Sequence, residues 1–437
     1  MTDPLAPNPI QTVAILTLGC KLNQAESESM ARELVAAGCR VVDRPAAADA
    51  FIINTCSVTH VADRKSRHLV RLARRLSPGA AVVLTGCYAE TAGQSLRELT
   101  GADLVVDNRD KTEVVRRLLA LRPPVCHDGA AFRPPAEAGR LRTRAFVKAQ
   151  EGCNDVCAFC IVPFTRGRER SVPVAEVVAA VRAREAEGVQ EVVITGTQLG
   201  AYGRDLGSGQ GPYALIRALL AETAVPRIRF SSLQPQDINE RLLALWEDPR
   251  LCRHFHLALQ SGSDTTLRRM RRRYTLDRYR QALALIRSHV PEAAVTTDVM
   301  VGFPGETEGE FQETEAFCRE AGFAGMHVFP YSRRPHTTAN LLREHVPEPV
   351  KKERLARLLA VARESARAFR SRLVGRTASV LWEEAQPAPA GGLPVWEGLT
   401  DTYVRVFLPS GQGLRNRLTA VRVLGLTDEG VLAEPLP

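Results

Sequence analysis

The sequence predicts an α/β protein built from three parts: an N-terminal parallel α/β sheet domain, a central partial β/α barrel and a small C-terminal all-β barrel. The first 121 residues alternate apolar, β-branched runs with helical stretches, which indicates a parallel sheet covered by helices. A second strand–helix series repeats about six times after position 145, as in a parallel barrel. From Gly375 the pattern changes to short alternating runs between Pro- and Gly-rich turns, which is typical of a small β-barrel.

The composition is that of an ordinary globular protein with a basic surface. Hydrophobic residues make up 45% and charged residues 24% of the 437 residues, which excludes a disordered, collagen-like or coiled-coil chain. No run reaches the ~18 apolar residues of a membrane span, and the first residues lack the features of a secretory leader. We therefore expect a cytoplasmic protein whose ten cysteines stay reduced and act as ligands or nucleophiles. The net charge of +9 suits a nucleic-acid partner without requiring one.

The N-terminal domain is predicted over residues 1–121, and a proline- and glycine-rich linker follows over residues 122–140. Its strands are the β-branched runs Val13–Leu18, Phe51–Thr55, Ala81–Thr85 and Leu104–Val106. Helices are expected between them at Ala25–Ala37, which Gly38 ends, and at Ser66–Leu76, which a Ser-Pro-Gly turn ends.

The barrel domain is predicted over residues 141–373, and the tail barrel over residues 374–437. Six barrel strands are expected at Phe146–Gln150, Glu191–Thr195, Ile228–Ser232, Phe255–Gln260, Val295–Val301 and Met326–Tyr331. Helices such as Val174–Glu187 and Leu276–His289 separate these strands, and a charged helix, Val350–Leu373, leads out of the barrel. In the tail, strands are expected at Thr377–Trp382, Thr402–Phe407 and Ala420–Leu424.

Three cysteines with the spacing C-x3-C-x2-C follow the first predicted barrel strand. We call Cys153, Cys157 and Cys160 the loop triad. Three thiolates from one loop can hold three corners of a cubane iron–sulfur cluster and leave the fourth iron without a protein ligand. The alternative is a structural zinc ion, which needs four ligands and would have to recruit His254 or His256. Three ligands at the mouth of a barrel favour the open, reactive site.

A second set of cysteines is dispersed along the chain but follows three predicted strands. We call Cys20, Cys56 and Cys87 the N-terminal triad. Because the carboxyl ends of parallel strands lie along one edge of a sheet, these three thiols should meet there as ligands of one group. The alternative is that they are three unrelated buried thiols. The remaining cysteines, for which the sequence indicates no such placement, are Cys39, Cys126, Cys252 and Cys318.

The motifs around both triads resemble a known family. The C-x3-C-x2-C spacing, with Phe159 before the last cysteine, is the signature of radical S-adenosylmethionine (SAM) enzymes. The flanking motifs resemble the methylthiotransferases; they are Leu18–Gln24, Asn54–Thr59, Thr85–Tyr88, Gln150–Asn154, Ile161–Gly167, Leu259–Asp264 and Val301–Glu306. They occur in the family's order and extend over nearly the whole chain.

This resemblance implies an N-terminal methylthiotransferase domain, a radical SAM barrel and a C-terminal RNA-binding TRAM domain. It further implies two [4Fe–4S] clusters as cofactors. The loop triad would hold the cluster that binds and cleaves SAM, and the N-terminal triad would hold an auxiliary cluster associated with the transferred sulfur. An electron donor and a sulfur source would come from outside the chain.

The substrate that the resemblance implies is adenosine 37 in the anticodon loop of tRNA, modified at C2. Features that most resemble the branch acting on N6-threonylcarbamoyladenosine are Cys20–Gln24, Gly200–Asp205, Arg268–Tyr274 and Phe329–Arg334, whereas Thr197 departs from that branch. The alternatives within the family are isopentenyladenosine 37 of tRNA and an aspartate of a ribosomal protein. A non-catalytic RNA-binding protein with structural zinc is the alternative from another class.

Contacts to SAM are expected at the carboxyl ends of the barrel strands, where barrel enzymes place their active sites. The candidates are Phe159, Thr195, Gly196, Ser231, Ser232, Gln260, Asp298, Gly302 and Phe303, any of which could instead simply end a strand. Contacts to RNA phosphates or to the threonyl carboxylate are expected from cationic side chains. The candidates are Arg268, Arg269, Arg271, Arg272, Arg273, Arg333 and Arg334, with a solvated surface as the alternative.

Overall fold

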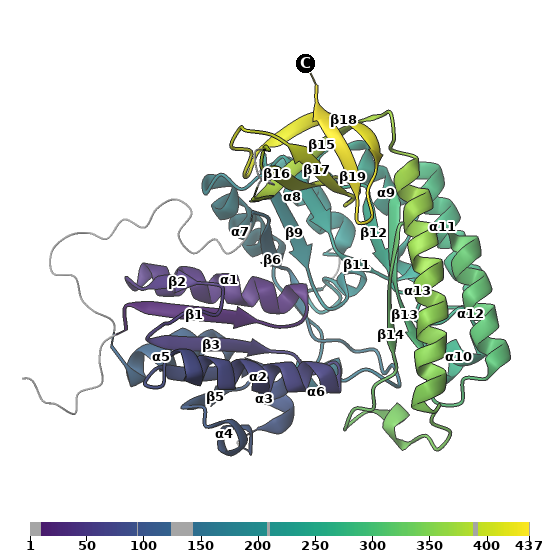
Figure 1. Cartoon of the computed structure of the whole chain (residues 1–437). Coiled ribbons are helices and arrows are strands. Elements are labelled where there is room, and N and C mark those ends of the chain that lie inside the picture. The colour runs from purple at the N-terminus through teal and green to yellow at the C-terminus, as the bar shows by residue number, and fades with distance from the viewer. Residues whose placement is uncertain (1–9, 94, 124–142, 208–209, 388–391, 437) are drawn as a thin grey trace, which may run out of the picture.

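The N-terminal domain is a five-stranded parallel sheet with helices on both faces (Figure 1). The computed structural model describes residues 10–93, 95–123, 143–207, 210–387 and 392–436. The strand order is β2-β1-β3-β4-β5, with every pair parallel. The elements are β1 (Thr12–Thr17), α1 (Lys21–Ala36), β2 (Arg40–Val42), β3 (Ala50–Thr55), α2 (His60–Leu76), β4 (Ala81–Gly86), α3 (Cys87–Ala92), α4 (Ser95–Thr100), β5 (Leu104–Val106), η1 (Lys111–Glu113) and α5 (Val114–Leu121).

The burial pattern explains why these segments form a covered sheet. Every residue of β3 and β4 is buried, as expected for central strands that are covered on both faces. One core cluster joins the sheet to α1 and α5, and another joins the opposite face to α2, α3 and α4. All four predicted strands are present, while β2 was not predicted. The helices α1 and α2 begin earlier than expected, because Cys20 and Thr59 are their N-caps.

The barrel domain is a partial barrel of parallel strands in chain order, which confirms the predicted fold class. Its strands are β6 (Ala145–Lys148), β9 (Glu191–Thr195), β10 (Arg227–Phe230), β11 (Ser232–Leu233), β12 (His254–Leu257), β13 (Ala294–Val301) and β14 (Gly325–Pro330). The expected strand 228–232 is interrupted at Ser231, so that β10 pairs with β9 and β11 pairs with β12. A short antiparallel pair, β7 (Gln150–Glu151) and β8 (Arg170–Ser171), closes the loop that carries the loop triad.

Helices cover the outside of this barrel and enclose its largest hydrophobic core. They are α7 (Val174–Ala186), α8 (Pro212–Glu222), α9 (Glu240–Leu243), α10 (Asp264–Arg269), α11 (Leu276–His289), α12 (Glu308–Ala321) and α13 (Glu348–Ser371), with α6 (Val162–Thr165) in the cysteine loop. Short 3-10 turns are η2 (Leu199–Ala201), η3 (Pro235–Asp237), η4 (Ala244–Glu247) and η5 (Thr338–Leu341). None of the helices in the described part of the chain is both long and apolar enough to cross a membrane.

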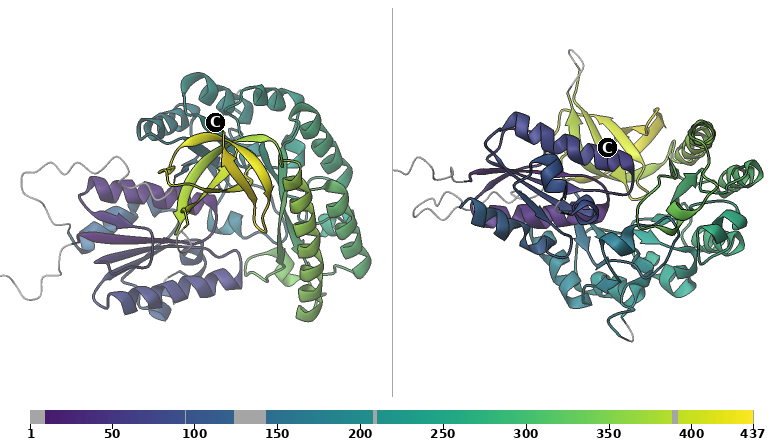
Figure 2. Two further views of the ribbon diagram at one scale, coloured as in Figure 1. Left: turned by 45° about the horizontal axis from the view of Figure 1, so that its top comes forward. Right: turned by 90° about the horizontal axis from the view of Figure 1, so that it is seen from below.

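The tail is a closed five-stranded barrel in the order β15-β16-β17-β19-β18. Its strands are β15 (Thr377–Gln386), β16 (Val395–Thr400), β17 (Arg405–Pro409), β18 (Leu418–Leu426) and β19 (Val431–Pro435). Figure 2 shows this barrel set over one end of the barrel domain, beside α13. The predicted linker lies outside the described residues, apart from its first two positions.

The tail barrel is fixed to the amino ends of the barrel strands, which is the end opposite the cysteine loop. Arg227, the first residue of β10, donates hydrogen bonds to the backbone oxygens of Ser379 (2.5 Å) and Leu399 (2.9 Å). The Tyr403 hydroxyl donates to Glu191, which begins β9. Since Arg227 and Glu191 are buried, the tail is part of one packed body with the barrel domain.

Candidate active site

The three cysteines of the N-terminal triad lie at the same edge of the N-terminal sheet. Thr17, Asn54 and Thr85 stand side by side in the register of β1, β3 and β4. The cysteines follow these positions by two or three residues, Cys20 as the N-cap of α1, Cys56 after β3 and Cys87 at the start of α3. The structure therefore brings together thiols that are more than thirty positions apart in sequence.

Glycine allows the close approach at this edge. Gly19 has a φ of +95°, and a Cβ there would lie 2.8 Å from Cβ and 2.9 Å from Sγ of Cys56. A side chain at position 19 would therefore collide with a member of the triad. Burial, and then the neighbouring Cys87 and Cys20, raise the pKa of Cys56 to about 11, against the backbone hydrogen bond from Val58 that lowers it. A thiolate at this position needs a compensating positive charge, which a bound iron centre supplies.

Amide side chains hold the three cysteine loops together. Asn23 Nδ2 donates to the backbone oxygens of Leu18 (2.7 Å) and Thr55 (2.9 Å), which joins the loops after β1 and β3. Asn54 Nδ2 donates to the backbone oxygen of Asn23 (2.8 Å). The hydroxyl of Thr55 donates to the backbone oxygen of Thr85 (2.5 Å), which adds the loop after β4. These bonds fix the edge before any ligand binds.

The loop triad lies in the excursion between β7 and β8, at the carboxyl end of the barrel. Gly152 starts this loop with a φ of +71°, and a Cβ there would lie 2.0 Å from the backbone oxygen of Arg168, so only glycine fits. The Cys153 thiol donates to Gln198 Oε1 (3.4 Å), and Arg272 Nη1 donates to Cys157 Sγ (3.0 Å). Burial raises the pKa of Cys153 to about 11 and that of Cys160 to about 12.

The donor sets suit iron–sulfur clusters better than zinc. Each triad offers three thiols, which matches a cubane that has one iron without a protein ligand. Within the described ranges, no three His, Cys, Asp or Glu side chains gather closely enough to hold a single metal ion. A structural zinc site needs four donors around one ion, whereas each thiolate of a cubane meets a different iron.

Several predicted SAM contacts lie at the carboxyl strand ends with unsatisfied polar atoms. Ser231 Oγ and Gln260 Oε1 are buried and have no hydrogen-bond partner among the residues that the structure describes. Gln260 also has a φ of +64°, which is strained for a residue with a side chain. Gly196 lies against Gln150, since a Cβ would be 2.9 Å from Gln150 Oε1. Orphaned oxygens and a strained residue at strand ends are what a polar ligand would satisfy.

Asp298 and Lys21 bring charge into the interior of the barrel. Asp298 lies between His256 (3.3 Å) and His327 (3.4 Å). Burial alone would raise the pKa of Asp298, but hydrogen bonds from these two histidines hold it well below its usual range. Lys21 follows Cys20 of the N-terminal triad, and burial, followed by repulsion from Arg229, lowers its pKa to about 7. The backbone of Phe146 in β6 donates to Glu28 of α1 (3.2 Å), so the helix that Cys20 caps packs against the barrel domain.

Three of the other predicted SAM contacts, Gly302, Phe303 and Phe159, pack against neighbouring elements. A Cβ at Gly302 would lie 2.4 Å from Cγ of Lys351, so this glycine admits α13. Phe303 is fully buried and packs edge-on against Tyr331, with 5.6 Å between ring centroids. Phe159 packs against the small core behind the cysteine loop. Thr195 is buried at the end of β9, and Ser232 begins β11.

The run of arginines around α10 does not form one solvated face, which was the alternative to phosphate binding. Arg272 contacts Cys157, and Arg273 pairs with Asp155 (3.1 Å) inside the cysteine loop. Arg269 donates to Glu310 (2.9 Å). Arg268 and Arg271 remain exposed. The run therefore supports the loop triad from one side, while Arg268, Arg271 and Arg273 are exposed to solvent.

The two arginines after β14 also differ from one another. Arg333 is exposed and donates to Asn340. Arg334 is buried and donates to Asp63 (2.8 Å) and to Ser57 (2.8 Å), so that it joins the barrel domain to the start of α2. Because its charge is already paired with Asp63, Arg334 is a domain-joining residue in this structure.

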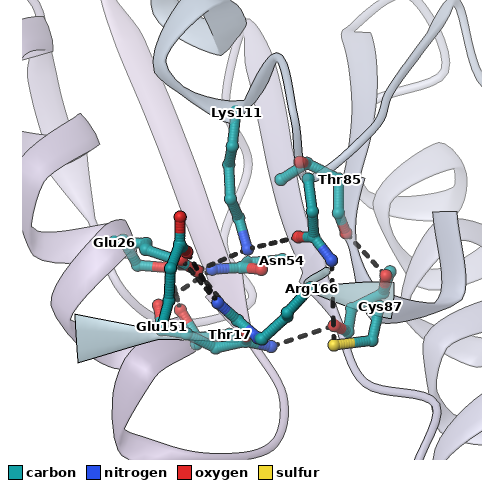
Figure 3. A network of polar contacts seen from close by, with 12 residues as sticks. Thr17, Glu26, Asn54, Thr85, Cys87, Lys111, Glu151 and Arg166 are labelled. Carbon is teal, nitrogen blue, oxygen red and sulfur yellow. Dashed lines mark hydrogen bonds and ion pairs between the residues drawn. The ribbon is translucent and has the colours of Figure 1, made fainter. Parts of the chain in front are cut away.

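A buried polar network, which the sequence motifs did not reveal, joins the N-terminal triad to the loop that carries the loop triad (Figure 3). Arg166, from the cysteine loop, donates to Glu26 Oε1 (2.8 Å) and to Asn23 Oδ1 (2.5 Å) on α1. Asn108 Nδ2 donates to the backbone oxygen of Thr165 (2.7 Å) and lies 3.9 Å from Cys87 Sγ. Glu26 also binds Lys111. A cavity of about 460 Å³ adjoins this network between the two domains.

The charges in this network compensate one another. Burial would raise the pKa of Glu26, but Lys111 and Arg166 hold it well below its usual range. The two cations and the carboxylate are thus mutually required, because an unpaired buried charge is costly. Arg166 lies in the motif 161–167 and Asn23 in the motif 18–24, so the motifs contained the signal, but neither side chain was assigned a partner.

Comparison with known proteins identifies the two larger domains. The Uncharacterized protein family UPF0004 matches residues 12–107, and the Radical SAM superfamily matches residues 147–318. The chain is 35% identical to the threonylcarbamoyladenosine tRNA methylthiotransferase MtaB of Bacillus subtilis, over 94% of each chain. It is 40% identical to MtaB of Aquifex aeolicus, covering 78% of this chain and 86% of that protein. It is 39% identical to a tRNA-2-methylthio-N(6)-dimethylallyladenosine synthase of Sorangium cellulosum, over 89% of this chain and 86% of that protein.

A solved structure agrees with the fold. The radical S-adenosylmethionine methyltransferase TsrM from Kitasatospora setae superposes with a TM-score of 0.54 at 15% identity, covering 76% of this chain and 77% of that chain. At this identity the likeness shows the fold alone. The relatives at 35–40% identity match most of their own length, and the chain therefore belongs to the radical SAM methylthiotransferase family.

Proposed function

We propose that the protein adds a methylthio group to C2 of N6-threonylcarbamoyladenosine at position 37 of tRNA. The observation that carries this proposal is that two separate three-cysteine sets border one domain junction, joined by a buried network. The relatives from Bacillus and Aquifex carry the threonylcarbamoyladenosine activity in their names. The comparisons do not favour a ribosomal-protein substrate or a non-catalytic zinc protein.

The residues present fit two [4Fe–4S] clusters, one in each triad. When bound, these clusters would supply the electron that cleaves SAM and the sulfur that is transferred, while SAM also provides the methyl group. The electron donor and the sulfur source come from outside the chain. We place the reaction in the cytoplasm, where tRNA and reduced thiols occur together.

The chain's own residues would bind and orient the small substrate. Ser231 and Gln260 each offer a buried oxygen without a partner at the carboxyl ends of neighbouring strands. Asp298 stays ionised between two histidines and can accept hydrogen bonds or balance a cation. Around them we place the remaining candidates for SAM contact, which are Phe159, Thr195, Gly196 and Ser232. The exposed Arg268, Arg271 and Arg333 are our candidates for contact with the RNA.

The substrate is tested by mass spectrometry of tRNA nucleosides. The reconstituted protein is incubated anaerobically with SAM, a reductant, a sulfide source and tRNA that carries either threonylcarbamoyladenosine or dimethylallyladenosine. We expect the methylthio product only on the first. A product only on the second would move the protein to the other tRNA branch. A colourless protein with stoichiometric zinc and no product on either would refute the enzymatic proposal.

A further inference from the structure

The helix α2 has one face that the proposed chemistry leaves unexplained. Its buried residues recur at helical spacing and pack on the sheet; they are Asp63, Ser66, Val70 and Ala73. The opposite face is exposed and basic, and it consists of Arg64, Lys65, His68, Arg71 and Arg75. We call these five residues the α2 face. In the described part of the chain, none of its four Arg and Lys side chains forms an ion pair.

The charge pattern of the α2 face is not explained by helix stability. Like charges three or four residues apart, such as Arg71 and Arg75, weaken a helix instead of supporting it. The one acidic residue of α2, Asp63, is buried and already paired with Arg334. Two further arginines of the helix have partners within the domain, since Arg67 donates to Tyr88 and Arg74 donates to the backbone of Ala80 and to Asp103. The four remaining cations are free to meet an external polyanion.

The α2 face starts beside the site of chemistry. The helix begins four residues after Cys56 of the N-terminal triad, with Thr59 as its N-cap. The backbone of His60 donates to Ser332 (3.3 Å), so the start of α2 is held against the rim of the barrel, as its position in Figure 1 illustrates. At a rise of ~1.5 Å per residue, the cations extend from about 6 to about 22 Å along the axis from that start.

The exposed groups around the start of α2 suit nucleobases. Val58 and Val61 are 56% and 48% exposed beside the N-terminal triad. Phe164, in the cysteine loop, is 44% exposed and stacks on His336 with 4.0 Å between ring centroids and 6° between planes. Flat, exposed rings next to a cationic stripe are the combination that binds single-stranded RNA. The tail barrel cannot fill this role at the mouth, because it is fixed to the opposite end of the barrel.

We propose that the α2 face is a binding surface for the phosphate backbone of the tRNA substrate, which it guides toward the two triads. This inference rests on the proposed function, because it names a further contact for the same substrate. Each phosphate contact releases about 0.7–0.9 counterions, so four contacts contribute about three units to the slope of log affinity against log salt.

The test compares two variants that each lose four exposed cations. The first replaces Arg64, Lys65, Arg71 and Arg75 with Gln. The matched control replaces Arg217 of α8 and Lys352, Arg363 and Arg367 of α13, which are also exposed but lie on the outside of the barrel, with Gln. Binding of tRNA to the full-length protein is measured by filter binding between 50 and 200 mM salt. Circular dichroism checks that both variants fold.

We expect the slope of log affinity against log salt to be about three units smaller for the α2 variant than for the wild type. Between 50 and 200 mM salt, the factor by which affinity falls should therefore be about 60 times smaller for the variant. The control should retain the wild-type slope and wild-type methylthio product. The single variant Arg71→Gln should lose about one unit, which keeps the test decisive if the fourfold variant misfolds. Equal slope losses in the α2 variant and the control, or an unchanged slope in Arg71→Gln, would overturn the inference. A wild-type protein that does not bind tRNA at all would instead refute the proposed function.

Discussion

Replacing Arg166 with Met should loosen the junction between the N-terminal domain and the barrel domain. The Arg166 side chain is only 2% exposed, and its guanidinium donates to Glu26 and Asn23 across the junction. Methionine keeps much of the apolar stem and removes three charge-assisted hydrogen bonds, two to Glu26 and one to Asn23. The carboxylate of Glu26 keeps Lys111 as a partner, so it is not left alone.

The size of this effect follows from the bonds that are lost. A hydrogen bond to a charged group contributes about 1.5 kcal/mol at the lower end of its range. Counting the two-pronged contact to Glu26 once and the contact to Asn23 once gives ~3 kcal/mol. This matches the lower limit for breaking a buried ion pair, as expected when one counter-charge remains. A loss of ~3 kcal/mol raises the equilibrium constant for opening of the junction on the order of 100-fold.

Amide hydrogen exchange measures that opening directly. In Arg166→Met, the amides of α1 and of the loop 152–169 should exchange on the order of 100-fold faster, while those of the tail barrel should not change. Arg170→Met is the matched control, because Arg170 begins β8 directly after the same loop, is 57% exposed and pairs only with Glu151 among the described residues. A surface pair is worth at most ~1 kcal/mol, so this control should change exchange less than about fivefold. Unchanged exchange in Arg166→Met would refute the assigned role of the network.

Three further predictions concern the triads and the charged interior. Replacing the loop triad with Ala should abolish release of 5′-deoxyadenosine and leave about four iron atoms per chain in the N-terminal triad, by iron analysis; continued release would show that the radical site lies elsewhere. Replacing the N-terminal triad with Ala should allow 5′-deoxyadenosine release while nucleoside analysis finds no methylthio product, and undiminished product would make those thiols bystanders. Glu26 has a lowered folded-state pKa, so its contribution to stability is complete above its unfolded pKa of ~4.3 and is lost as the pH falls below it. Urea unfolding should therefore show that the free energy of unfolding falls less between pH 6 and pH 3 in Glu26→Gln than in the wild type. If the free energies of the two proteins fall in parallel with pH, this interpretation of Glu26 is wrong.

The sequence predicted the strands well where burial imposes a continuous pattern. The fully buried β3 and β4, and the long helix α11, appeared within about a residue of their expected bounds. The short edge strand β2 was missed, because three residues give too little alternation to recognise. The expected strand 255–260 ends at Leu257, since Gln260 adopts a left-handed backbone that no hydrophobic pattern encodes.

The candidate site was predictable where parallel topology determines position. The strand-end rule placed the N-terminal triad correctly at one edge, since it depends only on strand direction. Contacts between domains had no such rule. Arg334 and Asp63 are 271 positions apart, and nothing in their local sequences distinguishes a buried ion pair from two solvated charges. The same limit applies to Arg272, whose neighbours in the run are exposed while it contacts Cys157.

The position of the tail barrel sets a minimum length for any partner that contacts both ends of the barrel domain. Its strand β13 extends from the tail contacts at Ala294 to the mouth at Val301, which is about 23 Å at ~3.3 Å per residue. A partner that touches the tail and the mouth together must therefore be at least that long and rigid enough to keep its ends apart. A free nucleoside is far too small, and a flexible peptide would lose much conformational entropy in spanning the distance. A base-paired stem that carries its target in a terminal loop satisfies both demands.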